Sequence, residues 1–226
     1  TTASGHYYTS STTTLAEGAA ALAIPSGTDI VVNLISGGIK PATPYQVAGS
    51  LTILSSVSSA KRVFTTASTT DASGATFYVT GTLNLYDGIL GPAANTDTVT
   101  TGEGGVIYAD NGKVNIYGGL IMGATAAKGG AIVLQGASSS KQAKLNMYSG
   151  VIRDGVATAG GGNVILEYAK FTMEDGLILN GKANNGANPY NDGGKSYLMT
   201  GNGGIIAQGI AANLGGNLYH SATNSK

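Results

Sequence analysis

The chain has 226 residues, enough for one domain with a sizeable core. Its 12 Lys and Arg residues balance its 12 Asp and Glu residues, so no net field attracts nucleic acid, and we expect no nucleic-acid partner. The absence of Cys excludes disulfides, thiolate metal sites and cysteine nucleophiles.

The composition favours a protein built from turns and uncharged surfaces. Charged residues make up only 11% of the chain, whereas Gly occurs 36 times and Ser, Thr and Asn are plentiful. Every long apolar segment is broken by Gly, Ser or Thr before it reaches about 18 residues, so we expect no membrane span. Because the first residue is Thr rather than Met, a secreted protein would have lost an export signal before Thr1.

The first predicted element is a short helix from Leu15 to Ala23. Thr14 and Glu17 have the spacing of a capping box, and the Ala and Leu residues between them and residue 23 favour a helix. The segment from Pro25 to Gly27 ends it. We expect residues 1–28 to form a cap, because an uncovered first strand edge would recruit another chain.

An internal repeat of 26 to 31 residues organises the chain from residue 29 to residue 182. Its clearest copies are LNLYDGIL from Leu83, VNIYGGLI from Val114, LNMYSGVI from Leu145 and FTMEDGLI from Phe171. Fainter copies are VNLISGGI from Val32 and LTILSSV from Leu51. A second element, Gly-Gly followed by a strand, is GGVIYA from Gly104, GGAIVL from Gly129, GGNVIL from Gly161 and GGIIAQ from Gly203.

The repeats predict a right-handed parallel β-helix, in which each repeat forms one rung. Apolar residues alternate within each copy, as in Leu83 and Leu85, and this period of two indicates a strand. A unit with short strands and Gly corners cannot bury its apolar face alone, but stacked copies can. A sandwich or an antiparallel barrel is disfavoured, because its strands need not resemble one another.

The region from residue 183 to residue 226 departs from the repeat. The segment NNGANPYNDGGKS reads as a polar loop, and the later strands are irregularly spaced. We expect irregular C-terminal rungs or a cap here, within the same single domain.

The repeats resemble those of bacterial surface-anchored, adhesin-like proteins of the pectate-lyase-type β-helix superfamily. The segment from Gly161 to Gly181, GGNVILEYAKFTMEDGLILNG, is very similar to one of their repeats. The segment from Thr14 to Leu34 looks like their opening helix and first strand, and residues 47–67 resemble their early rungs. The resemblance covers about residues 12–182. It implies a location outside the bacterial cell or on its surface, and it does not imply catalysis.

The alternative function is that of the polysaccharide lyases and hydrolases that share this fold. Lyases of this shape generally need clustered carboxylates for calcium and an Arg or Lys base. Arg occurs only at Arg62 and Arg153, and Arg153 beside Asp154 reads as a weak surface ion pair.

Hydrolases need two carboxylates about 5 to 9.5 Å apart. Asp87 and Asp175 share a repeat position three rungs apart, which separates them by about 14 Å. Glu174, beside Asp175, reads as a solvated turn residue. A cluster of three acidic groups within about 10 Å on one face would instead favour an enzyme.

No metal or cofactor is predicted. His6 and His220 lie near opposite ends of the chain, and a metal site would need both of them together with a carboxylate. The Gly-Gly pairs precede strands rather than helices, so they are not phosphate-binding loops.

The most interesting residues point outward from the predicted strands. If the alternating apolar residues face inward, the outer surface carries a column of Tyr beside a column of Asn, formed by Tyr86, Tyr117 and Tyr148 and by Asn84, Asn115 and Asn146. The simpler interpretation is that these columns stabilise the stacked rungs. The functional interpretation is an aromatic strip that contacts sugar rings or a partner protein.

These patterns favour a non-catalytic, structural or adhesive extracellular module that contacts a glycan or a neighbouring surface protein. One alternative is a carbohydrate-active enzyme. Another is a subunit that associates with its own kind through the C-terminal region, which an uncovered final rung would indicate.

Overall fold

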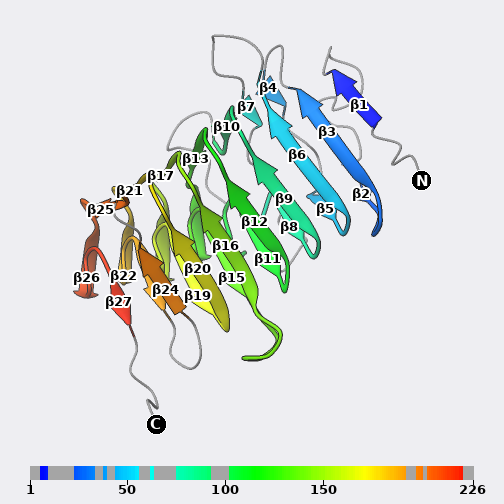
Figure 1. Cartoon of the computed structure of the whole chain (residues 1–226). Helices are drawn as coiled ribbons and strands as arrows, with labels where there is room; N and C mark the ends of the chain where they lie inside the picture. Colours follow the sequence, from blue (N-terminus) through cyan, green and yellow to red (C-terminus); the bar gives the residue numbers. More distant parts are fainter. Residues whose placement is uncertain are drawn as a thin grey trace.

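The computed structural model describes residues 6–9, 23–33, 38–39, 44–55, 62–63, 75–92, 102–191, 197–200 and 203–220. In these ranges the chain forms strands and turns and no helix. Figure 1 shows the strands stacked in chain order, from the blue N-terminal end to the red C-terminal end. The described part of the chain is therefore a parallel β-solenoid, as the repeats predict.

The strands form four sheets, and each strand pairs in parallel with the equivalent strands of the neighbouring rungs. Sheet A contains β1 (His6–Thr9), β3 (Asp29–Asn33), β6 (Ser50–Leu54), β9 (Thr82–Leu85), β12 (Lys113–Ile116), β16 (Ala143–Met147), β20 (Ala169–Met173) and β24 (Tyr197–Thr200). Sheet B contains β2 (Ala23–Ile24), β5 (Tyr45–Val47), β8 (Phe77–Val79), β11 (Ile107–Asp110), β15 (Ile132–Gln135), β19 (Val164–Glu167), β23 (Pro189–Asn191) and β27 (Tyr219–His220).

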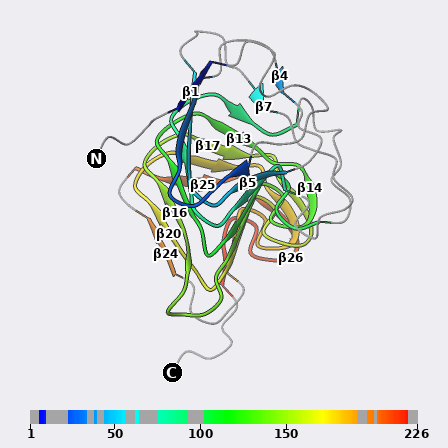
Figure 2. The same ribbon diagram turned by 90° about the vertical axis from the view of Figure 1, so that its right-hand side faces the viewer.

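Two further sheets complete the rungs. Sheet C contains β4 (Gly38–Ile39), β7 (Arg62–Val63), β10 (Ile89–Leu90), β13 (Leu120–Met122), β17 (Val151–Arg153), β21 (Leu177–Leu179) and β25 (Ile205–Ala207). Sheet D contains β14 (Thr125–Lys128), β18 (Val156–Gly160), β22 (Lys182–Asn185) and β26 (Ile210–Leu214). Seen from the N-terminal side, successive turns overlie one another around a shared interior (Figure 2).

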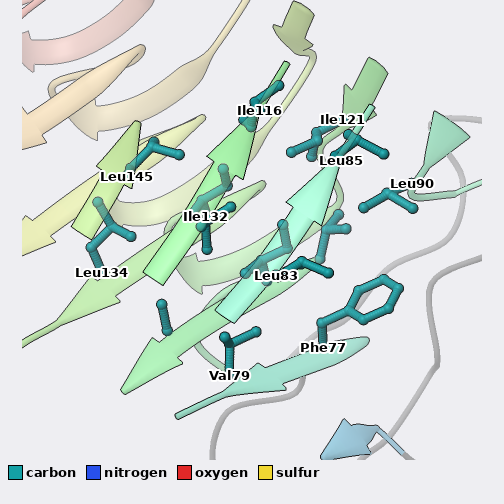
Figure 3. Packing of buried hydrophobic residues seen from close by; sticks show 14 of the residues in the cluster. Phe77, Val79, Leu83, Leu85, Leu90, Ile116, Ile121, Ile132, Leu134 and Leu145 are labelled. Atoms are coloured by element: carbon teal, nitrogen blue, oxygen red, sulfur yellow. The ribbon is translucent and has the colours of Figure 1, made fainter. Parts of the chain in front are cut away.

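The core is formed by the apolar residues that alternate along the strands. Leu83 and Leu85 are 0% and 1% exposed, and the residues at the same places on the next rungs are also buried. Figure 3 shows side chains from β8, β9, β12 and β15 meeting in the interior. Each fully buried Leu or Ile side chain contributes about 1.5 to 3 kcal/mol relative to exposure. The inward positions predicted for the repeats are confirmed.

The predicted register is right for the clear copies and wrong for one faint copy. Val114 pairs with Leu83 and with Leu145, so these copies lie on neighbouring rungs as expected. The repeat predicts that Val32 occupies the same position as Leu51 and Leu83. Leu51 does pair with Leu83, but its partner on the preceding rung is Ile30. Val32 therefore lies two residues further along. Both residues point inward, since a shift of two preserves the face of a strand.

The prediction is wrong for the Gly-Gly element that begins at Gly203, which leads into a different sheet from the other three. The predicted strand after Gly203 and Gly204 is β25, which pairs with β21 in sheet C rather than continuing sheet B. In the last rung the sheet B position belongs to β27, after Gly215. Gly precedes an apolar strand at two different corners of the solenoid, so the motif alone cannot distinguish them.

The corners between sheets C and D require glycine. A Cβ at Gly181 would overlap the carbonyl oxygen of Ala187, and a Cβ at Gly155 would overlap that of Gly162. The chain can therefore turn from β17 into β18 within two residues, because Gly155 carries no side chain.

The two ends of the solenoid differ in what can be described. The predicted helix from residue 15 to residue 23 lies outside the described residues, apart from Ala23, which begins β2. After residue 182, strands β22 to β27 continue the four sheets. Within the described ranges, no helix has the length and apolar character needed to cross a membrane.

Candidate functional site

The three tyrosines of the predicted strip stack on consecutive rungs, and each follows directly after a strand of sheet A. Backbone hydrogen bonds from Tyr117 N–H to the Leu85 carbonyl and from Tyr148 N–H to the Ile116 carbonyl keep the rungs in register. The ring centroids are 4.4 Å apart for Tyr86 and Tyr117 and 4.8 Å apart for Tyr117 and Tyr148. The interplanar angles are 14° and 7°. We call these three residues the tyrosine column.

Stacking covers the surfaces of the three rings that face one another. Tyr86 is 51% exposed, and Tyr117 and Tyr148 are each 38% exposed, because each inner face covers a neighbouring ring. Burial between its neighbours, their charges and a hydrogen bond with the Tyr86 hydroxyl raise the pKa of Tyr117 above its ordinary value. A sugar ring therefore cannot stack between these rings, but it can hydrogen-bond to the row of hydroxyls.

The predicted asparagine column is a continuous chain of hydrogen bonds. The Asn146 amide donates to Asn115 Oδ1 at 2.8 Å, Asn115 donates to Asn84 Oδ1 at 2.7 Å, and Asn84 donates to the Thr52 hydroxyl at 3.2 Å. Asn115, in the middle, is only 4% exposed. The column stabilises the stacked rungs, and each amide nitrogen retains a second N–H.

A third column on the same face was missed from the sequence. Lys113 pairs in register with Lys144, and Lys144 with Lys170, and all three side chains are exposed. We call these residues the lysine column. The signal was present, since a Lys precedes the inward residue in KVNI, KLNM and KFTM. The outer face of sheet A thus carries lysine, asparagine and tyrosine columns side by side.

An ion-pair cluster beside sheet B was also missed. The Lys128 ammonium lies 2.7 Å from Glu167 Oε1 and 3.3 Å from Glu103 Oε1. Burial would lower the pKa of Lys128, but its hydrogen bond to Glu167 and the two negative charges outweigh burial and raise that pKa above its ordinary value. Glu103 and Lys128 share a repeat position, since each precedes a Gly-Gly pair and the two form a parallel bridge between neighbouring rungs. Glu167 ends β19, and only the fold brings it to Lys128.

Tyrosines adjoin this cluster. Burial, followed by the charges of Glu103, Asp110 and Glu167, raises the pKa of Tyr108 to about 12. Burial and a 2.7 Å hydrogen bond to the Asp110 carboxylate likewise raise the pKa of Tyr78 to about 12. Two of the three carboxylates that act on Tyr108, those of Glu103 and Glu167, are already paired with Lys128.

Comparison of the chain with protein-family models, curated proteins and solved structures gives no match. The parallel β-solenoid is visible directly in the strand pairing, whereas the likeness to adhesin-like proteins stays a prediction from the repeats. The chemistry open to this surface follows from its geometry.

The acidic residues at the equivalent turns have local structural roles. Asp87 Oδ1 accepts a hydrogen bond from the Gly88 N–H at 2.6 Å, and Asp175 Oδ1 accepts one from Gly176 at 2.7 Å. Both side chains are exposed, as is Glu174, which ends the tyrosine column on the next rung. These contacts fix turns and leave the two Asp residues on separate rungs.

The remaining candidates are not brought together. Arg153 Nε lies 3.4 Å from Asp154 Oδ2 in a partly exposed ion pair, which contributes little. His6 is in β1, on the first rung of sheet A, and His220 is in β27, on the last rung of sheet B. Among the described residues, no group of three His, Asp or Glu side chains could hold a metal ion.

A second asparagine column lies inside the solenoid. Asn163 and Asn188 come directly before the sheet B strands β19 and β23, and their fully buried side chains reach the corner between sheets C and D, where the Asn163 amide donates to Asn188 Oδ1 at 2.7 Å. Asn163 Oδ1 accepts from Gly155 N–H, and Asn188 Oδ1 accepts from Gly181 N–H. Asn217 repeats this contact with the next corner glycine. The signal was the Asn after Gly-Gly or Gly-Ala in the later repeats.

Proposed function

We propose that this protein is a non-catalytic structural and adhesive module that presents the outer face of sheet A to a glycan or to a protein on a neighbouring surface. The observation that carries the proposal is the register of this face. Three kinds of polar side chain repeat there on neighbouring rungs, with the tyrosine and lysine columns exposed. Such a surface suits a partner that extends along the solenoid axis.

The resemblance of the repeats supports the biological setting of this proposal. We infer an adhesin-like protein with a right-handed solenoid and an N-terminal capping helix. It would act outside the bacterial cell or on its surface after removal of an export signal. Right-handed crossovers are the rule for parallel strands in one sheet.

The tyrosine hydroxyls provide the test. Replacing Tyr86, Tyr117 and Tyr148 together by Phe keeps the stacked rings but removes the hydroxyls. We expect the variant to lose on the order of tenfold in affinity for glycans that the wild type binds on an array, because each net hydrogen bond is worth about 1 kcal/mol. Its melting temperature should stay within a few degrees.

Two controls separate binding from stability. Tyr168 is 44% exposed but lies outside the column, so Tyr168→Phe should leave binding unchanged. The triple Ser variant also loses the ring contacts, and it should lose about 0.2 to 1 kcal/mol of stability for each of the stacked pairs. If the triple Phe variant binds as tightly as the wild type, the tyrosine column is only a support for the rungs.

One observation favours a carbohydrate-active enzyme as the second candidate. Glu103 and Glu167 share Lys128, so their carboxylates approach the separation found in glycoside hydrolases. The Lys128 ammonium, however, is bonded to both carboxylates and occupies the space where a glycosidic bond would have to lie. This arrangement suits a structural ion-pair network better than an acid and base pair.

The last rung supports self-association as a further alternative. It exposes Ile205, Ile210, Leu214 and Leu218, each at least half exposed. Strands β24 to β27 end their sheets in the described part of the chain. An end of this kind can pair with strands of another chain.

A further inference from the structure

We propose that the ligand of sheet A is a linear anionic polysaccharide whose repeated negative charges lie along the lysine column. This inference rests on the proposed function and names the chemical class of the partner. It is carried by the lysine column, which lies on the same face as the predicted tyrosine and asparagine strip but was not part of that prediction.

The three positive charges of the lysine column have no ion-pair partner among the described residues. Strands β12, β16 and β20 hold Lys113, Lys144 and Lys170 in register on consecutive rungs. No carboxylate in the described ranges forms an ion pair with any of them, whereas Lys128 has two such partners. Like charges that face each other across neighbouring strands destabilise a sheet. The column therefore attracts negative charge from outside the fold.

Asp110 and Glu167 lie three residues before Lys113 and Lys170, but they end strands of sheet B, where Asp110 accepts a hydrogen bond from Tyr78 and Glu167 pairs with Lys128. The acidic groups on the face of sheet A itself are farther from the column. Asp29 occupies the same column three rungs before Lys113, about 14 Å away. Glu174 is four residues along the chain from Lys170, about 13 Å in an extended strand. Both separations exceed the screening length of about 10 Å at 0.1 M salt. The face is thus locally positive although the chain is neutral overall.

A linear polymer fits this face better than a single small anion. One small anion pairs with one lysine, but charges linked at about the rung spacing of 4.8 Å pair with all three, and linkage raises their effective concentration. The tyrosine column adds phenol hydroxyls along the same axis, and the partly exposed Asn84 and Asn146 add amide N–H groups on either side of the buried Asn115. A polysaccharide carries hydroxyls between its charges, so it can use all three columns.

The experiment measures binding of the full chain to three polymers of similar length. Alginate carries carboxylates, dextran sulfate carries sulfates, and dextran is neutral. We expect the wild type to bind alginate or dextran sulfate but not dextran, with affinity falling as salt rises. The two anionic polymers show whether carboxylate or sulfate is the preferred charge.

Matched variants locate the binding. Lys144→Gln should weaken binding about threefold, whereas Lys182→Gln, which removes an exposed lysine from sheet D, should change nothing. The triple variant Lys113→Gln, Lys144→Gln and Lys170→Gln should lose on the order of tenfold or more in affinity with an unchanged melting temperature. Replacing the same three lysines by Arg keeps the charge and should retain binding.

Several outcomes would overturn the inference. They are no binding to either anionic polymer at low salt, equal binding to dextran, or equal losses for Lys144→Gln and Lys182→Gln. If neutral glycans bind through the tyrosine hydroxyls without the lysines, this inference fails while the proposed function stands. If neither these polymers nor a glycan array or surface protein binds, both fail.

Discussion

Leu145→Asp is expected to unfold the rungs around it. Leu145 is 0% exposed and lies between Val114 and Phe171 in sheet A, so the new carboxylate would have no water and no cationic partner. The effective cost of an unpaired buried charge is several kcal/mol, a large part of the 5 to 15 kcal/mol that typically stabilises a domain. Far-ultraviolet circular dichroism during heating measures the loss.

The residue next to Leu145 supplies the matched control. Lys144 is exposed on the outer face, so Lys144→Asp introduces the same carboxylate into water. It should change stability by no more than about 0.5 kcal/mol. If both variants keep the wild-type spectrum and melting temperature, the inward assignment of Leu145 is wrong.

Asn188→Ala is expected to cost about 3 kcal/mol or more. The Asn188 side chain is fully buried, accepts hydrogen bonds from Gly181 N–H and the Asn163 amide, and donates to the Ala207 carbonyl. Alanine leaves these groups unpaired in the interior, and each unsatisfied buried group costs about 1 to 3 kcal/mol. Denaturant unfolding followed by circular dichroism measures the difference.

Asn184 is the control for this substitution. It is exposed, and its amide makes one hydrogen bond, to the Thr158 carbonyl at 2.6 Å. Asn184→Ala should cost no more than about 0.5 kcal/mol. Equal losses for the two variants would show that the inner asparagine column does not specially stabilise the corner between sheets C and D.

The rungs could be predicted from the sequence because their information is local and repeated. Alternation such as Leu83, Asn84 and Leu85 gives a strand and its inward face, and four similar segments give the register. The tyrosine and asparagine columns follow from the same alternation, since residues of one face keep their place from rung to rung.

Other features depend on contacts that no repeat encodes. Sheet D consists of segments such as TAAK and VATAG, whose sequences share little, although their strands pair. Lys128 reaches Glu167 only because sheet D brings it beside sheet B, whereas Glu103 bridges Lys128 in parallel on the neighbouring rung. Gly203 and Gly215 both precede strands, but only three-dimensional pairing shows which corner each one makes.

The outer face of sheet A and the cluster around Lys128 suit different functions. The outer face of sheet A has long, regular columns that suit binding along the axis. The cluster around Lys128 is local, and its two carboxylates already have a cationic partner. We therefore expect sheet A to contact the partner and the cluster around Lys128 to support the fold.

The most direct test of this account is to incubate the purified protein with the polysaccharides that it binds and to follow their chain length and newly formed reducing or unsaturated ends. We expect the polymer to be retained by the protein and to keep its length. Shortened chains produced by the wild type but not by Glu167→Gln would contradict the account and establish a carbohydrate-active enzyme with its site at Glu103, Lys128 and Glu167.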